Sequence, residues 1–414
     1  MSALKSVQVS AATLLVLAAV SACGSSGGSS NSASSLSSRS GAARITLGFA
    51  VPIDSTIQAF PEVKSAMEAT TDAINAAGGI NGHKVQDMFC DTQFTANGEI
   101  SCMRELTVAK VSAIIDPNLI NDQSGAGIKF AVANGIPVVG TQGLSPFDFT
   151  TPGVFALGSG NPGYAYGAVA ALVKSGAKKI ALFGSNESGA DYILGLCADA
   201  LKSAGMKPAA FVQVDPSADP TFASGAAKVE SAGVDGVVIM SSPTYIPKEV
   251  LSLRQTGYSG SIATVAAVVT PPIIQALGAH ANGVMVSSQL ALVSDTSNPA
   301  VAAFEAVMKK YQPQALLDED SEQMYAAIKL FATVMAHATS FAPSAVLKAF
   351  KSLSSPVNLG LIGPYQVVPQ RTYLKFAPQI YNPTVAIGRV QNGVIVADPH
   401  QLINPFTILT SSHS

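Results

Sequence analysis

A helical repeat that ends in a glycine pair is the feature that most constrains the fold of this chain. In residues 61–77, apolar or small side chains recur every three or four positions, so they share one face of a predicted helix. These side chains are Val63, Met67, Thr70, Ile74 and Ala77. Pro61 suits the first turn of this helix, and Gly78 suits its end. Predicted strands at residues 44–50 and 84–90 flank the helix, so we expect a βαβ unit and a parallel sheet.

The same alternation of short apolar stretches and helical segments continues along most of the chain. Further strands are predicted at residues 113–115, 137–141, 179–183, 209–214, 236–240 and 262–266. Because these stretches are rich in Val and Ile and apolar on both faces, they suit strands that helices cover on each side. The chain has 414 residues, 48% of them hydrophobic, which is enough to build two cores. We therefore predict an α/β fold with two doubly wound, mainly parallel sheets.

The end of the first predicted helix also carries a family motif. Residues 72–82 read DAINAAGGING. This run resembles the INAAGGINGxKV segment of branched-chain amino-acid binding proteins, which are solute receptors of ABC transporters with the type I periplasmic-binding-protein fold. Weaker matches follow in the family's order at residues 135–139, 178–181, 233–237 and 363–364. The motif is characteristic of the fold and says little about the ligand.

The resemblance implies two lobes joined by a three-strand hinge. The chain would cross between the lobes near residues 157–161, 286–292 and 363–365, and such multiple crossovers restrict motion largely to bending and twisting. Lobe 1 would comprise residues 44–158 and 290–362, and lobe 2 residues 159–289 and 363–405. Residues 406–414 would form a frayed C-terminal tail.

The front end of the chain predicts export and a lipid anchor. Residues 1–22 contain an early Lys5 and an apolar run that is too short to span a bilayer, so they suit a signal peptide. The sequence Val-Ser-Ala-Cys that ends at Cys23 resembles a bacterial lipobox, in which the cysteine becomes lipidated. Residues 23–43 would then form a Ser/Gly-rich tether that holds the protein at the outer face of the cell membrane. The alternative is an ordinary secretory peptide with an incidental cysteine.

Three further cysteines follow the lipobox. Cys90 and Cys102 lie close in the sequence of an exported chain, and some relatives have a cysteine pair near this place. We expect a disulfide between them; two free thiols or a metal-binding pair are the alternatives. Cys197 shares a helical face with apolar residues, which indicates a buried core position.

The candidate ligand site follows from the fold. In open α/β sheets, ligands lie beyond the carboxyl ends of the strands, where loops lead into helices. The loops at residues 52–58, 117–123 and 140–146 would face those at 186–192, 241–245 and 265–270. Their candidate ligand-binding residues are Asp54, Ser55, Asn121, Gln142, Gly143, Leu144, Gly189, Asp191, Tyr192, Ser242, Tyr245 and Ala266.

The resemblance fails where amino-acid recognition is expected. Relatives use a Ser or Thr hydroxyl for the substrate carboxylate where this chain has Asn121, and an acidic residue for the ammonium where it has Ala266. A buried ammonium needs a carboxylate or several acceptors, and only Asp54 or Asp191 could take over that role within these loops. We therefore expect a small, largely neutral or apolar ligand that is not a standard α-amino acid, such as an amide, an aliphatic or aromatic acid, or another non-zwitterion. Submicromolar leucine binding would contradict this expectation.

Other functional classes are less compatible with the sequence. The GxGxxG match at residues 158–163 suits the first crossover better than a dinucleotide site. Outside the Ser/Gly-rich tether the sequence has no GxSxG nucleophile elbow, and it has no HExxH motif. Charged residues make up 12% of the chain and the net charge is -2, which disfavours a nucleic-acid partner. We expect a nonenzymatic monomer, without cofactor or metal, that serves an ABC permease and its ATPase. The alternatives are a receptor domain for a membrane signalling partner, branched-chain amino-acid binding proper, and an enzyme built on this fold.

Overall fold

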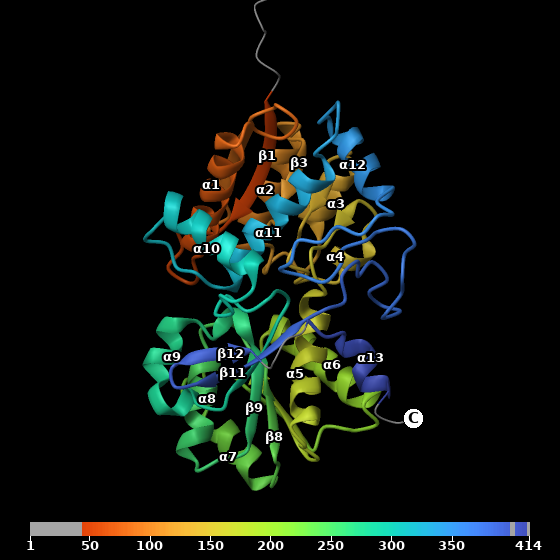
Figure 1. Ribbon diagram of the computed structural model, residues 1–414. Helices are drawn as coiled ribbons and strands as arrows, with labels where there is room; N and C mark the ends of the chain where they lie inside the picture. The colour runs from red at the N-terminus through yellow and green to blue at the C-terminus, as the bar shows by residue number, and fades with distance from the viewer. Residues whose placement is uncertain (1–43, 398–401, 412–414) are drawn as a thin grey trace, which may run out of the picture. The chain divides into compact units, whose positions relative to one another are not determined.

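The computed structural model describes residues 44–397 and 402–411, which all belong to one compact unit (Figure 1). The predicted signal peptide, Cys23 and the Ser/Gly-rich tether lie outside the described residues. Among the helices that are described, none has both the length and the apolar character needed to cross a membrane.

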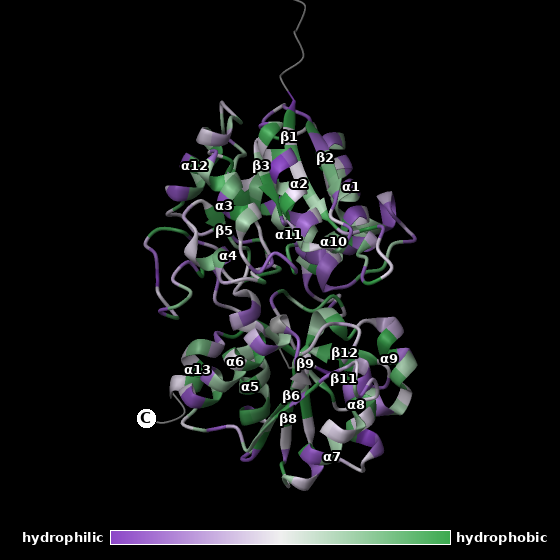
Figure 2. Ribbon diagram, turned by 180° about the vertical axis from the view of Figure 1, so that it is seen from behind, coloured by the Kyte–Doolittle hydropathy of each residue, from purple (hydrophilic) through white to green (hydrophobic). Residues whose placement is uncertain are grey.

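The first sheet has five strands in the order β2-β1-β3-β4-β5, all parallel. The strands are β1 (Ile45–Val51), β2 (Val85–Asp91), β3 (Ala113–Ile115), β4 (Val138–Val139) and β5 (Val154–Phe155). The intervening helices are α1 (Pro61–Ala76), α2 (Ala96–Val108), α3 (Ala126–Ala133) and α4 (Phe147–Thr150). Ile45 pairs in parallel with Val85, which confirms the predicted βαβ unit. In Figure 2 the hydrophobic colour runs along β1, in agreement with its nearly complete burial.

The second sheet has seven strands in the order β12-β11-β10-β9-β8-β6-β7. The strands are β6 (Ile180–Ser185), β7 (Ala210–Val214), β8 (Gly236–Ile239), β9 (Ser261–Val265), β10 (Met285–Ser288), β11 (Ala386–Gln391) and β12 (Val394–Ala397). Its helices are α5 (Gly160–Lys174), α6 (Ser188–Ser203), α7 (Ala223–Ser231), α8 (Ile246–Gln255), η1 (Ala266–Val268), α9 (Pro271–Leu277), η2 (Gly278–Ala281) and α13 (Pro405–Ser411). Only β11 is antiparallel to both of its neighbours in the described sheet. The predicted fold class, two mainly parallel sheets with helices, is therefore confirmed.

The elements around the five-stranded sheet are called lobe 1 below, and those around the seven-stranded sheet lobe 2. The chain leaves lobe 2 after β10 and forms α10 (Pro299–Tyr311), α11 (Glu319–Val334) and α12 (Pro343–Lys351). Figure 1 shows α10 and α11 beside α1, and both helices contact it. Phe304, Phe331 and Phe350 are fully buried in the same core as Phe49 of β1. These helices therefore complete lobe 1, and the chain returns to lobe 2 at β11.

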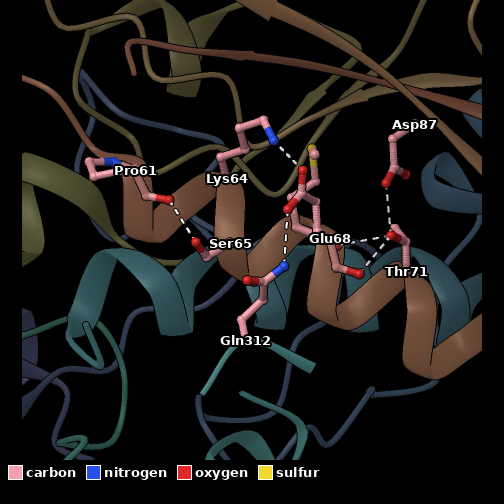
Figure 3. Close-up of polar contacts among 8 residues, drawn as sticks. Pro61, Lys64, Ser65, Glu68, Thr71, Asp87 and Gln312 are labelled. Atoms are coloured by element: carbon pink, nitrogen blue, oxygen red, sulfur yellow. Dashed lines mark hydrogen bonds and ion pairs between the residues drawn. The ribbon is translucent and has the colours of Figure 1, made fainter. Parts of the chain in front are cut away.

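Polar contacts along α1 fix its position in lobe 1 (Figure 3). The Gln312 side chain, just after α10, donates from Nε2 to Glu68 Oε2 at 3.1 Å. Thr71 Oγ1 donates to Asp87 Oδ2 of β2 at 2.8 Å. Lys64 forms an ion pair with Glu68 one turn along the helix. Together these contacts hold α1 against both β2 and α10, and so set the place of the residues in its first turn.

Buried hydrogen bonds join the crossovers between the lobes. Gln289 follows β10, and its Oε1 accepts from the Gly160 N–H at 2.7 Å, while its Nε2 donates to Gln142 O at 2.9 Å. Glu319 Oε1 accepts from the Gln289 N–H at 2.7 Å and from the Tyr164 hydroxyl at 2.9 Å. The first crossover, the second crossover and α11 therefore meet in one polar network.

The predicted disulfide between Cys90 and Cys102 is present and links β2 to α2. Cys197 is a free, fully buried thiol in the lobe 2 core, as predicted. Burial raises the pKa of this thiol well above its ordinary value. It therefore acts as a small apolar residue rather than as a nucleophile.

The prediction that the C-terminal residues are frayed is wrong for residues 405–411. This segment forms α13, which packs against α5. Phe406 is 4% exposed and its ring centroid lies 5.1 Å from that of Tyr166, and Leu409 is fully buried. Phe406 and Leu409 lie three positions apart on one helical face, and their burial stabilises this short helix. The polar residues around them leave no clear helical pattern in the sequence.

Candidate functional site

A cavity of about 420 Å³ lies at the carboxyl ends of the parallel strands and is lined by residues of both lobes. Lobe 1 contributes the segments that follow β1, β2, β3 and β4, and the segment that leads into α11. Lobe 2 contributes the start of α5 and the segments that follow β6, β8 and β9. This position agrees with the general rule for ligand sites in open α/β sheets.

The structure brings several of the predicted site residues together in this cavity. They are Gln142, Leu144, Gly189, Tyr192 and Ser242. Gln142 is buried and donates from Nε2 to Asp320 Oδ1 at 2.7 Å. Burial raises the pKa of the Tyr192 hydroxyl to about 12, so this group remains a neutral hydrogen-bond donor at ordinary pH.

The remaining predicted residues are not among those that line the cavity. They are Asp54, Ser55, Asn121, Gly143, Asp191, Tyr245 and Ala266. Asn121 is used internally, because its main-chain N–H and its Nδ2 both donate to the buried Glu99 carboxylate at 3.0 Å. Asp191 Oδ1 accepts from Gln213 Nε2 at 3.2 Å, and Asp54 is exposed. The two acids proposed as alternative ammonium partners therefore lie outside the cavity lining.

Sequence reasoning missed three acidic residues of the cavity: Glu62, Asp318 and Asp320. Each offers a carboxylate oxygen, and these oxygens lie within 4.8 Å of one another. We call them the acidic triad. Glu62 lies in the first turn of α1, Asp318 is the N-cap of α11, and Asp320 follows in its first turn. Two helices thus point their N-termini toward one place, and the helix dipoles favour acidic side chains there.

The local sequence explains how α11 holds its two acids. Asp318 Oδ1 accepts from the Ser321 N–H at 3.0 Å, and Ser321 Oγ accepts from the Asp318 N–H at 3.0 Å, which forms a reciprocal capping box. The sequence signal was the run Asp318-Glu319-Asp320 before a helical segment. An acidic cap and an acidic ligand-binding residue look alike in sequence, so this signal alone does not identify a site.

Burial and mutual repulsion favour the protonated forms of the triad. Burial, with a further contribution from the Asp318 charge, raises the pKa of Glu62 to about 7. Burial also raises the pKa of Asp318, and burial together with the charges of Asp318, Glu319 and Glu62 raises that of Asp320 well above its ordinary value. Among the described residues that line the cavity there is no Lys, Arg or His. The cavity therefore contains three carboxyl groups with no cationic side chain in its described lining to stabilise their ionised forms.

In lobe 2, serine hydroxyls that line the cavity donate hydrogen bonds to acidic side chains that do not line it. Ser241 Oγ donates to Glu249 Oε1 at 2.6 Å, and Ser242 Oγ donates to Glu187 Oε2 at 2.5 Å. The two serines line the cavity, whereas Glu249 and Glu187 are not among the lining residues. Burial, with the Glu187 charge adding to it, raises the pKa of Glu249 to about 8. Lobe 2 therefore presents neutral polar groups.

Most of the lining is apolar. Phe60 and Phe94 lie side by side with ring centroids 6.4 Å apart. The other apolar members include Ile120, Leu144, Ile193, Met240, Val268, Ile273 and Leu316. A concave, mainly apolar surface with a few polar groups is typical of small-molecule binding sites.

A family model described as periplasmic binding protein matches residues 44–373. The chain belongs to this family. Members are exported ligand-binding proteins, and the resemblance to ABC-transporter receptors of the branched-chain amino-acid type is confirmed. A search of curated proteins finds no match to this chain.

Solved structures of this family share the fold at low sequence identity. An extracellular ligand-binding receptor from Verminephrobacter eiseniae is 19% identical, with a TM-score of 0.73, and the match covers 85% of this chain and 99% of the receptor. A leucine-binding protein from Thermotoga maritima is 20% identical, with a TM-score of 0.69 and coverage of 87% and 99%. A solute-binding protein of an ABC transporter from R. palustris, in complex with 4-hydroxybenzoate, is 17% identical, with a TM-score of 0.71 and coverage of 87% and 96%. These similarities establish the type I periplasmic-binding-protein fold.

Proposed function

We propose that this protein is an extracytoplasmic, lipid-anchored solute-binding protein that delivers a small organic solute to an ABC importer. The observation that carries the proposal is the cavity, which is lined by both lobes at the carboxyl ends of their strands. A solute that contacts both lobes stabilises the arrangement in which they close around it, and this is a population shift rather than a chemical step. The permease would recognise the closed form, and its ATPase would drive import of the released solute.

We propose further that the ligand is not a standard α-amino acid. An amino acid needs partners for a carboxylate as well as for an ammonium group. The described cavity lining contains three carboxylates and no cationic side chain, so it offers nothing of opposite charge to a substrate carboxylate. Asn121, which replaces the hydroxyl of the relatives, is occupied by Glu99.

In this proposal the protein binds and releases its solute and does not catalyse a reaction. The polar side chains of the described cavity lining are the acidic triad, the hydroxyls of Ser, Thr and Tyr residues, and amide side chains. Cys197 is fully buried in the lobe 2 core, and the other described cysteines form a disulfide. The proposed anchor is Cys23, which would carry the lipid at the end of the Ser/Gly-rich tether.

Two linked experiments test this function. Mass spectrometry of ligand released from the purified full-length protein identifies the solute, and uptake of the labelled solute is then compared in cells with and without the gene. We expect uptake to be lost on deletion and restored by the wild-type gene. A Cys23→Ala variant should release the protein from the membrane fraction and reduce uptake. Intact uptake with altered transcription would instead support a sensor, and turnover of the solute would support an enzyme.

A further inference from the structure

We propose that the cavity binds a small organic cation, an ammonium compound with an apolar body and no carboxylate, and that Glu62, Asp318 and Asp320 hold its charged group. This inference rests on the proposed solute-binding function and names the class of solute. It replaces the expectation of a neutral ligand, which followed from strand-end loops that do not include the triad.

The first observation is the geometry of the triad. Three carboxylate oxygens lie within 4.8 Å of one another, on α1 and at the start of α11. A single positive group placed among them would lie within contact distance of all three. Like charges this close repel one another, and a cation between them would reverse the sign of the local interaction.

The second observation is that the buried acids of the cavity have no cationic partner in the described structure and that a buried amide oxygen beside them has no hydrogen-bond partner. Asp318 and Asp320 are 7% and 9% exposed, and Oδ1 of each accepts a hydrogen bond, from the Ser321 N–H and from Gln142 Nε2. Neither forms an ion pair with a described residue. Asn118, which also lines the cavity, is 6% exposed, and its Oδ1 has no hydrogen-bond partner in the described structure. Buried acceptors of this kind are unfavourable unless something supplies donors or positive charge.

The charge of the lining excludes an acidic ligand. Every charged residue of the described cavity lining is acidic. Asp318 caps the N-terminus of α11 and occupies the Ser321 N–H, so an anion at this helix end would compete with the cap and meet an acidic side chain. A carboxylate on the ligand would therefore meet repulsion without compensation.

The rest of the lining favours an organic cation over a metal ion. A calcium ion requires six to eight oxygen ligands and would use only the acidic corner of a cavity of about 420 Å³. The Phe60 and Phe94 rings and the aliphatic side chains instead match an apolar body attached to the charged group. Aromatic faces also attract ammonium groups.

A series of small probes that differ mainly in charge tests this inference on the purified full-length protein. Calorimetry would compare phenethylamine and benzyltrimethylammonium with neutral 2-phenylethanol, anionic 3-phenylpropanoate, zwitterionic phenylalanine and calcium chloride. We expect at least one of the two cations to bind at least about tenfold more tightly than 2-phenylethanol, which corresponds to about 1.4 kcal/mol. A preference for phenethylamine would indicate an N–H donor on the ligand, and a preference for benzyltrimethylammonium a quaternary group.

Isosteric variants show whether the triad causes the preference. Asp318→Asn keeps a good N-cap, and Asp320→Asn keeps an oxygen for Gln142. Each should reduce the preference for the cation by about tenfold without loss of the fold. The matched control is Asp116→Asn, because Asp116 is a buried lobe 1 acid, 5% exposed, that does not line the cavity. This control should keep the preference.

Several results would overturn the inference. They are equal or tighter binding of the alcohol or the acid, a preference that persists in both triad variants, binding of calcium alone, and failure of both cationic probes to bind. These results leave solute uptake untouched, so transport of a neutral or acidic solute would show that the charge assignment failed while the proposed function held. Conversely, cation binding with no role in uptake would remove the transport function and keep the site.

Discussion

Both lobes place acidic side chains near the cavity, but those of lobe 1 form part of its surface, whereas those of lobe 2 lie behind serine hydroxyls. Glu62, Asp318 and Asp320 line the cavity, and Ser241 and Ser242 separate Glu249 and Glu187 from it. A hydroxyl that donates to a carboxylate satisfies part of its charge locally. The difference indicates that lobe 1 sets the charge of the ligand and lobe 2 mainly its shape.

The lobes also differ in how they are held together. Lobe 1 has a disulfide between β2 and α2, whereas the described cysteine of lobe 2 is the buried thiol Cys197. Lobe 1 is assembled from two separate chain segments, because α10, α11 and α12 join it only after the chain has passed through lobe 2. A covalent link within the first of these segments restricts its unfolded state.

The largest expected effect is therefore on the stability of lobe 1. A Cys90→Ser/Cys102→Ser double variant removes a cross-link between residues 12 positions apart. Chain-entropy arguments predict a loss of about 3 kcal/mol in the free energy of unfolding. Urea denaturation followed by circular dichroism would measure it. The matched control in lobe 2 is Cys197→Ser, which keeps the disulfide and should therefore lose as much stability in reducing agent as the wild type does.

The wild-type protein should also lose this stability in dithiothreitol, and the double variant should not change. If dithiothreitol destabilised the double variant as strongly as the wild type, the disulfide would not be the feature that distinguishes lobe 1. A double variant as stable as the wild type in the absence of dithiothreitol would also contradict this difference between the lobes.

The next largest effect is on the pH dependence of stability, which differs between the cavity-lining acids of lobe 1 and the serine-bonded acids of lobe 2. The pKa of Glu62 is raised from 4.5 to about 7, so the folded state binds this proton more tightly than the unfolded state. Its contribution to stability is present below pH 4.5 and is lost as the pH rises to about 7. Allowing for partial exposure, the loss is about 2 kcal/mol. Thermal unfolding of the ligand-free protein should show this decline, and Glu62→Gln should reduce it.

Glu249 of lobe 2 provides the matched control for this pH effect. Its pKa is raised to about 8, so Glu249→Gln should also reduce the loss of stability as the pH rises, over a window that extends to about pH 8. Cation binding should strengthen as the pH rises toward about 7 in the wild type and in Glu249→Gln, because Glu62 ionises over this range in both. A binding curve with the same pH dependence in Glu62→Gln as in the wild type would contradict the assignment of ligand charge to lobe 1.

The sequence was sufficient to predict the fold because its signals are local. Val- and Ile-rich stretches such as residues 236–240 are apolar on both faces, which requires helices on each side of a sheet. The glycine pair after α1 adopts positive φ angles of 110° and 85°, a conformation that favours glycine and ends the helix there. By contrast, α13 depends on contacts with α5, which no local pattern records.

The cavity could be predicted only in part, because its surface combines strand ends with segments from elsewhere. Gln142 and Ser242 follow β4 and β8 directly, so the rule for strand ends selects them. Asp318 and Asp320 lie at the start of α11, in the part of the chain that joins lobe 1 late, and no strand marks them. Their proximity to Glu62 is a tertiary property that neither periodicity nor motif contains.

The smallest expected effect tests the shielding of acids in lobe 2. Ser241 Oγ donates to Glu249 and accepts from the Ser185 N–H at 2.7 Å, so Ser241→Ala leaves a buried carboxylate oxygen and a buried N–H without this partner. We expect a loss of about 1 kcal/mol in the free energy of unfolding and a further rise in the pKa of Glu249. Urea denaturation measures the former, and the pH dependence of unfolding reports the latter.

Ligand preference distinguishes shielding from ligand contact in the same variant. If the hydroxyl only satisfies Glu249, the ratio of cation to alcohol affinity should remain that of the wild type, because the carboxylate becomes easier to protonate and stays neutral at pH 7. Ser242→Ala is the control on the less buried neighbour Glu187, and it should cost less stability. A large change in cation preference in Ser241→Ala would show instead that lobe 2 also sets the charge of the ligand, and the division of roles between the lobes would no longer hold.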